Sequence, residues 1–178
     1  MISPKHWEVT ESMNFKDAMS LVANTVSVLS VRSFNERVHA CTISSLVSIS
    51  VIKDSEMVLF VLKKDSKIGT LIRDVGYFSI NVLGKGQASY ASEYSSDRKV
   101  EFVSQGKWAP HGNELVKLND CKVFFACTFE KIIEDYPSNI FIARVTTLEL
   151  ENEGSCLVYE NRNFGFVNSI SKSLKILS

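Results

Sequence analysis

The chain has 178 residues, 45% of them apolar, and its twenty basic and twenty acidic residues cancel. A chain of this length can bury roughly 70% of its unfolded surface around one core, so we expect a single domain over residues 1–178. The balanced charge, with no run rich in Lys and Arg, argues against a nucleic-acid partner.

No apolar run approaches the length of about eighteen residues that a membrane span needs, and residues 1–12 lack the apolar core of a signal peptide. We therefore expect no membrane segment and a cytoplasmic location. The four cysteines, Cys41, Cys121, Cys127 and Cys156, form no CxxC pair and no cluster with the histidines. This spacing predicts free, mostly buried thiols and no metal site.

The first predicted element is a short amphipathic helix after Asn14. Asn14 is a suitable N-cap, and Asp17 falls in the first turn, where an acidic residue is favourable. The helical period places Phe15, Met19 and Val22 on one face.

Strand composition recurs along the rest of the chain. The predicted strands are residues 25–32, 41–50, 57–62, 77–83, 121–133 and 139–150. The last two are long enough to cross the wall of a tilted barrel. We also expect the apolar segment 123–129 to exceed what one small barrel can bury, which predicts dimerisation.

Two further helices are predicted between the strands. In the segment 65–76, Asp65 or Ser66 can cap the start, Gly76 can close the end, and Ile68, Leu71 and Ile72 form an apolar face. The segment 86–96 predicts a second helix. Strands outnumber helices, and neither GxGxxG nor a P-loop is present, so the sequence favours a mostly antiparallel barrel with appended helices.

The segment 41–50, CTISSLVSIS, has an unusual number of hydroxyls for a strand. If it is one strand, alternation places Thr42, Ser44, Leu46, Ser48 and Ser50 on one face and mostly apolar residues on the other. One interpretation is a half-exposed strand whose hydroxyls face water. The other is a row of short donors and acceptors for a flat ligand with polar edges, such as a flavin ring.

A phosphate group would need a separate anchor, and the start of the helix after residue 64 offers one. Its first turn has unpaired backbone N–H groups and the positive end of the helix dipole, with Ser66, Lys63, Lys64 and Lys67 nearby. The alternative interpretation is an ordinary capped surface helix.

Three motifs carry a resemblance to a known family when taken in order. They are Thr-x-Ser-Ser followed by Ser-x-Ser in residues 42–50, Phe-x-x-Asn-Val-Leu in 78–83, and Leu-Val-Tyr in 157–159. Over about residues 15–165 the chain resembles the flavin reductase-like, FMN-binding split-barrel family. The resemblance implies a six-stranded antiparallel split β-barrel with appended helices, and a homodimer with flavin near the interface. Members typically reduce FMN or FAD with NADH or NADPH, and many supply a partner monooxygenase.

The resemblance also implies positions for the site. The residues expected to line the flavin are Thr42, Ser44, Ser45, Ser48 and Ser50. Ser66 and Lys67 would lie near its phosphate. Asn81 would support the site from its strand, and Tyr159 and Arg162 would reach the flavin's edge.

The chain departs from the family before its last long strand. Many members carry Gly-Asp-His there, with the His close to the nicotinamide. A gapless match puts Ser138 at the position of the His, whereas a local insertion puts Tyr136 there, so these two are the nicotinamide-side candidates. Ala40 also replaces a usual Gly, and a polar turn, IKDSE, replaces a usual Pro-Pro.

Two functions therefore stand at this point. The first is an NAD(P)H-dependent flavin reductase, which needs no protein nucleophile because hydride moves directly from nicotinamide to flavin. The alternative is a protein that binds or carries flavin without oxidising NAD(P)H itself, which the replaced His favours. An oxidase for a small phosphorylated substrate is a weaker third, because no compact Arg/Lys set suits two phosphates.

Overall fold

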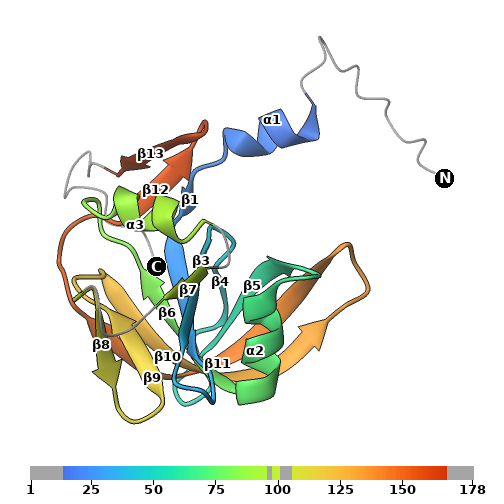
Figure 1. Ribbon diagram of the computed structural model, residues 1–178. Coiled ribbons are helices and arrows are strands. Elements are labelled where there is room, and N and C mark those ends of the chain that lie inside the picture. The colour runs from blue at the N-terminus through green and yellow to red at the C-terminus, as the bar shows by residue number, and fades with distance from the viewer. Residues whose placement is uncertain (1–13, 96–97, 101–105, 168–178) are drawn as a thin grey trace.

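Antiparallel β-structure makes up most of the protein in the computed structural model, which describes residues 14–95, 98–100 and 106–167 (Figure 1). The helices are α1 (Phe15–Ser20), α2 (Lys67–Val75) and α3 (Ala88–Glu93). The strands are β1 (Asn24–Thr25), β2 (Ser27–Arg32), β3 (Val38–Ile43), β4 (Val47–Ser50), β5 (Met57–Lys63), β6 (Tyr77–Val82), β7 (Arg98–Val100), β8 (Trp108–His111), β9 (Leu115–Leu118), β10 (Val123–Ile133), β11 (Ser138–Leu150), β12 (Leu157–Glu160) and β13 (Asn163–Phe166).

The main sheet has eight strands in the order β4-β5-β11-β10-β6-β2-β3-β7, and every pairing in it is antiparallel. Its six central strands run from β5 to β3, and these two end strands lie against each other. The sheet therefore curls into a barrel that is split between β3 and β5. The predicted six-stranded antiparallel split barrel with appended helices is confirmed.

The prediction of one strand over residues 41–50 is wrong. β3 ends at Ile43 and pairs with β2, whereas β4 begins at Val47 and pairs with β5. Because β2 and β5 belong to opposite sides of the split, the chain must cross it between the two strands. The hydroxyl face expected from simple alternation is therefore interrupted at residues 44–46.

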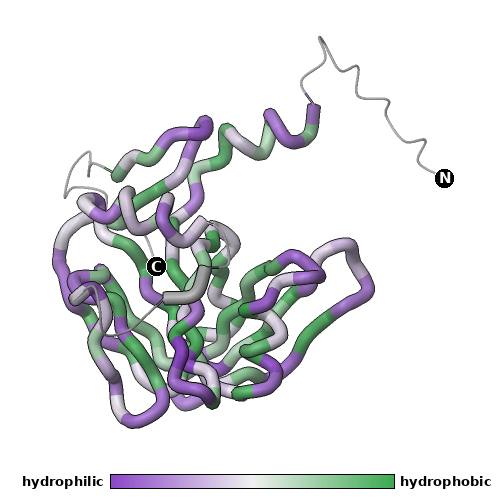
Figure 2. Tube along the Cα trace, viewed as in Figure 1, coloured by the Kyte–Doolittle hydropathy of each residue, from purple (hydrophilic) through white to green (hydrophobic). Residues whose placement is uncertain are grey.

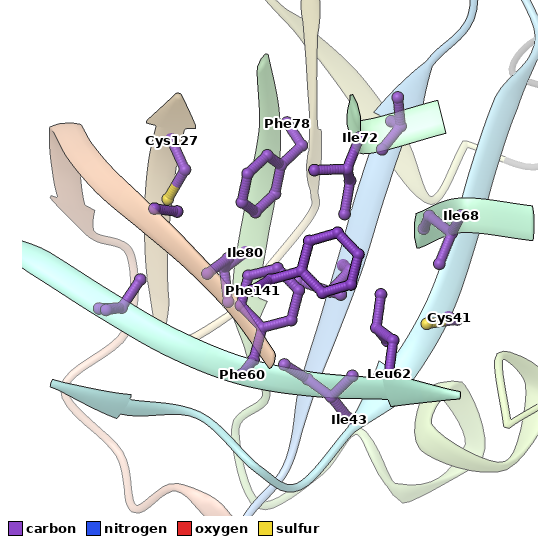
Figure 3. Close-up of a cluster of buried hydrophobic side chains, with 14 of the residues drawn as sticks. Cys41, Ile43, Phe60, Leu62, Ile68, Ile72, Phe78, Ile80, Cys127 and Phe141 are labelled. Carbon is purple, nitrogen blue, oxygen red and sulfur yellow. The ribbon is translucent and has the colours of Figure 1, made fainter. Parts of the chain in front are cut away.

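A cluster of aromatic and aliphatic side chains fills the barrel (Figure 3). Phe60 stacks on Phe141 with ring centroids 5.4 Å apart, and Phe78 meets Phe60 edge to face at 5.5 Å. Helix α2 adds Ile68 and Ile72, both fully buried. These offset and edge-to-face contacts are the favourable arrangements for aromatic pairs, and they hold β5, β6 and β11 as one rigid wall.

The local signals for α2 and α3 are confirmed. Ser66 caps α2 by accepting a hydrogen bond from the Gly69 N–H, and Gly76 ends it in the left-handed region at φ 84°. Of the predicted apolar face, Ile68 and Ile72 are buried and Leu71 is half-buried. The predicted helix over residues 86–96 is shorter, because α3 covers only Ala88–Glu93.

Helix α1 forms after Asn14 as predicted but ends at Ser20, so Val22 lies beyond it, and no described part of the chain covers the apolar face of the helix. The Asn14 side chain accepts from the Asp17 N–H, as an N-cap should, and the helix contains no buried residue. Phe15 is 80% exposed. The helix projects away from the barrel, although apolar residues are part of it (Figures 1 and 2).

Segment 123–129, by contrast, is not the source of surplus apolar surface. It lies in β10, a central strand between β6 and β11, where Cys127 is buried in the barrel core and Phe124 and Ala126 are buried in a separate cluster with Cys121. Phe125 and Phe129 also pack against the core cluster. The expectation that this segment exceeds what the barrel can bury is therefore wrong. Exposed apolar side chains lie instead on and just after α1, around the β4–β5 turn, at the end of β11 and on the β12–β13 hairpin.

The four cysteines are free, with Cys41, Cys121 and Cys127 buried and Cys156 half-buried. Burial raises the pKa of the Cys121 and Cys127 thiols to about 12, so both are poor nucleophiles. Within the described ranges, no group of three or more His, Cys, Asp or Glu side chains could hold a metal ion. No helix in these ranges has the length and apolar composition to cross a bilayer.

Asn81 is a buried polar link between three strands. Its Nδ2 donates to the Val28 carbonyl at 3.1 Å and the Ser30 hydroxyl at 3.2 Å, and its Oδ1 accepts from the Leu118 N–H at 2.8 Å. The side chain thus joins β6 to β2 and β9. It has no exposed surface and lies on the face of β6 opposite Phe78 and Ile80, so it ties the β8–β9 hairpin to the outer face of the barrel wall.

Replacing Asn81 by Ala should lower the free energy of unfolding by about 3 kcal/mol, because two buried backbone groups lose their partners. Ser79→Ala, on the same strand, is the matched control. Its buried hydroxyl has no hydrogen-bond partner among the described residues, so its loss should change the free energy by less than about 0.5 kcal/mol. Urea unfolding measures both, and equal effects of the two substitutions would refute the role given to Asn81.

Candidate functional site

An open groove runs along the split of the barrel and consists of two adjoining hollows of about 400 and 660 Å³. Both are lined by Thr42, Ile43, Ser44 and Ser95. We call the first the hairpin hollow, because the β12–β13 hairpin forms its far side, and the second the helix hollow, because it ends at the start of α2. The two volumes are in the range of small-molecule and cofactor sites.

The helix hollow ends in a cationic region. Lys63, at the end of β5, and Lys67, the first residue of α2, line it together with Ser66 and one acidic residue, Asp65. α2 has nine residues, and its first N–H groups and the positive end of its dipole face this region. The combination favours an anionic group such as a phosphate.

Two of the predicted hydroxyls hold the walls of the groove. The Thr42 hydroxyl donates to the Ala91 carbonyl at 2.8 Å, and the Thr42 N–H donates to the Tyr94 carbonyl at 2.7 Å, which joins β3 to α3. The Ser45 hydroxyl accepts from the Val61 N–H at 2.9 Å and donates to its carbonyl at 3.3 Å. Ser45 therefore links the chain to β5 across the split.

Ser44 differs from these two neighbours. It is exposed, it lines both hollows, and its hydroxyl has no hydrogen-bond partner in the described part of the chain. Of the hydroxyls at the centre of the groove, Ser44 is thus the one from segment 41–45 that is available to a ligand.

Trp108 and Lys107 hold helix α3 in place in addition to Thr42. The Trp108 indole N–H donates to the Tyr94 hydroxyl at 3.2 Å, and Lys107 donates to Glu93 at 2.7 Å. The hydrogen bond to Glu93 raises the pKa of Lys107, and burial raises that of Tyr94. These contacts place Ser92 and Ser95 of the α3 segment along the groove.

The hairpin hollow combines aromatic rings with one guanidinium. Tyr159 on β12 lies opposite Phe164 on β13 in the ladder, with ring centroids 5.3 Å apart. Arg162, in the turn between them, forms an ion pair with Asp17 of α1. Val26, Ile43 and Ala91 provide apolar surface. This end suits a flat, partly apolar group that carries negative charge.

The structure brings seven of the predicted residues to the groove and leaves five outside it. Those that line it are Thr42, Ser44, Ser45, Ser66, Lys67, Tyr159 and Arg162. Ser48 and Ser50 lie on β4, and Asn81 is buried between the barrel wall and β9, so none of the three lines either hollow. Tyr136 lies in the β10–β11 turn, and Ser138 starts β11 opposite Lys63 of β5.

The sequence did not point to Ser92, Ser95 or Phe164. The two serines reach the groove only because Thr42 binds the end of α3, a contact 49 residues apart in sequence. Phe164 could have been found, because a two-residue turn after Glu160 places it opposite Tyr159.

Comparison with known proteins covers most of the chain. A family model described as "Flavin reductase like domain" matches residues 19–168. The NADH-dependent flavin reductase StyB of Pseudomonas fluorescens is 28% identical over 136 residues, 76% of this chain and 77% of StyB. The NADH:riboflavin 5'-phosphate oxidoreductase of Streptomyces pristinaespiralis is 27% identical over 120 residues, 67% of this chain and 67% of the relative. The styrene monooxygenase flavin reductase SMOB of Pseudomonas putida S12 has the same fold, with a TM-score of 0.76, 24% identity, and coverage of 88% of this chain and 99% of SMOB.

Proposed function

We propose, from the premise that this chain belongs to the flavin reductase like domain family, that it is an NAD(P)H-dependent flavin reductase. The reaction is hydride transfer from a reduced nicotinamide to FMN or FAD. The names of two relatives support NADH as the donor, and one of them acts on riboflavin 5'-phosphate, which is FMN.

The observation that carries the proposal is the groove, with a cationic helix start at one end and short hydroxyls in the middle. FMN has one phosphate and a flat ring with polar edges, so the residues present fit it. Ser66, Lys67 and Lys63 would hold the phosphate, and Ser44 would meet the ring edge. When bound, the flavin supplies the chemistry of accepting a hydride and releasing its electrons.

The protein's own residues bind and orient. Thr42 fixes α3 to β3, and Ser45 fixes the crossing segment to β5, so both walls of the groove are rigid before a ligand enters. Placing two reactants in a fixed geometry supplies much of the rate enhancement in such a reaction. No nucleophilic side chain is required for the transfer.

A flavin-carrying protein is the second candidate, and the β10–β11 turn favours it. Tyr136 is exposed there and Ser138 lies beside Lys63, at the two positions where the family's usual His would fall. No His lines the groove within the described residues. Tyr136 and Ser138 stay our candidates for the nicotinamide side.

The proposal also covers the oligomeric state, the partner and the location of the protein. We expect a homodimer, supported by α1, which has an apolar face and no buried residue. A partner monooxygenase that receives the reduced flavin is supported by the family and by SMOB, a component of styrene monooxygenase. The four free cysteines support the cytoplasm as its location.

The purified protein should accelerate reduction of FMN by NADH. With FMN present and oxygen excluded, the flavin absorption band should bleach at least about tenfold faster than in a protein-free mixture. NADPH is tested in the same way to choose the donor. A flavin that binds but bleaches no faster with either nucleotide would establish the carrier instead.

Replacing Ser44 by Leu should weaken FMN binding about tenfold, or about 1.4 kcal/mol, because the side chain fills the centre of the groove. Ser48→Leu is the matched control on β4, outside both hollows, and should change the affinity less than twofold. Quenching of flavin fluorescence measures both. Equal losses would mean that the flavin lies along β4 rather than in the groove.

Light scattering should give the mass of a dimer for the wild-type protein, and the double variant Phe15→Glu, Met19→Glu should be monomeric. Both side chains belong to the exposed face of α1, where burial in a partner would be favourable. Lys16→Glu, an exposed polar position on the same helix, should leave the dimer intact. A monomeric wild-type protein would contradict the proposal.

A further inference from the structure

We propose that Arg162 recognises the diphosphate group of a dinucleotide at the hairpin end of the groove, as a specificity-determining residue. The inference rests on the proposed function, in which the helix end of the groove holds the single phosphate of FMN. It names a second anion subsite, for the ADP group that NADH and FAD share.

The backbone at Arg162 is the first observation. Asn161 and Arg162 form the two-residue turn between the paired residues Glu160 and Asn163, and their φ angles are 47° and 62°. Positive φ at both positions is typical of a type I′ turn, for which Asn-Gly is the preferred sequence. Asn161 fits its position, but a side chain at the second position is strained, and glycine would relieve the strain.

Packing does not compensate for this strain. The Arg162 side chain is 61% exposed, and its ion-pair partner within the described residues is Asp17, which is 39% exposed. Exposed ion pairs of this kind contribute little to stability. The side chain of Arg162 therefore makes no contact with the described part of the chain that offsets the backbone strain at this position. Strain of this kind is a recognised feature of functional residues.

The position of Arg162 indicates what it binds. It lines the hairpin hollow with Tyr159 and Phe164, whereas Lys63 and Lys67 line the helix hollow at the other end. The single phosphate of FMN explains the lysines of the helix hollow but leaves Arg162 without a ligand. A guanidinium binds phosphate oxygens in a bidentate manner, and neighbouring aromatic rings can stack on a base. A diphosphate next to a base is the chemistry that this end fits.

The ion pair with Asp17 provides a test, because substitutions of Asp17 and of Arg162 should change the ligand affinity in opposite directions. Its carboxylate pairs with Arg162 in the free protein, so a bound diphosphate must displace it. If Arg162 binds the ligand, loss of the Asp17 charge should strengthen binding and loss of Arg162 should weaken it. If the pair only holds α1 on the hairpin, both changes should act in the same direction.

The experiment compares Arg162→Gly, Arg162→Lys and Asp17→Asn with the wild type. ADP is titrated into FMN-loaded protein by calorimetry, and the KM for NADH is measured at saturating FMN. We expect Arg162→Gly to weaken ADP binding and raise that KM about tenfold, with FMN affinity within about twofold and a melting temperature no lower than that of the wild type. Arg162→Lys should restore part of the affinity, and Asp17→Asn should tighten ADP binding and lower the KM.

The arms also separate the two sources of the diphosphate. If the subsite serves FAD, Arg162→Gly should reduce FAD affinity relative to FMN and leave the KM for NADH with FMN unchanged. Unchanged ADP binding, an equal loss of FMN affinity, or the same direction of change in Asp17→Asn and Arg162→Gly would overturn the proposal. ADP and FAD binding can be measured without turnover. If the wild-type protein fails to oxidise NADH, the reductase proposal is refuted, but the binding measurements still test the role of Arg162.

Discussion

The crossing of the barrel's split by residues 44–46 is the constraint on which the site depends. β3 and β5 lie against each other at the two ends of the six central strands, and the chain must pass from one to the other to reach β4. The Ser45 hydroxyl satisfies both backbone groups of Val61 at this point. The crossing leaves Ser44 exposed above the split, and the groove lies along it.

The walls of the groove depend on a rigid barrel and on a few distant contacts. Phe60, Phe78 and Phe141 fix β5 in the barrel wall, so the start of α2 has a defined position beside the helix hollow. α3 reaches the groove through Thr42 and is held below by Trp108 through Tyr94. Preorganisation of this kind lets small hydroxyls orient a ligand without further rearrangement.

Charge is divided between the two ends of one groove. Lysines and a helix start lie at one end, and a single arginine between two aromatic residues lies at the other. Flavin and nicotinamide nucleotides are both flat and anionic, and each must place its ring near the middle for hydride transfer. Separate anion sites at the two ends would keep the phosphates apart while the rings meet, which connects the proposed reductase with the subsite at Arg162.

Local sequence by itself determined the elements whose signals are complete within one turn or strand: the start of α2 at Asp65 or Ser66, its end at Gly76, its apolar face and the strand from Met57. It also identified the family and seven groove residues, from motifs and carry-over by position. Tertiary structure alone decided that segment 41–50 is two strands, because both halves have strand composition and no Gly or Pro marks the crossing. It likewise decided that Asn81 is buried between the barrel wall and β9 and that α3 forms one wall of the groove, since their partners are 30 or more residues away. Side-chain periodicity reports which face a residue takes relative to its neighbours, whereas long-range pairing decides which strand lies beside it.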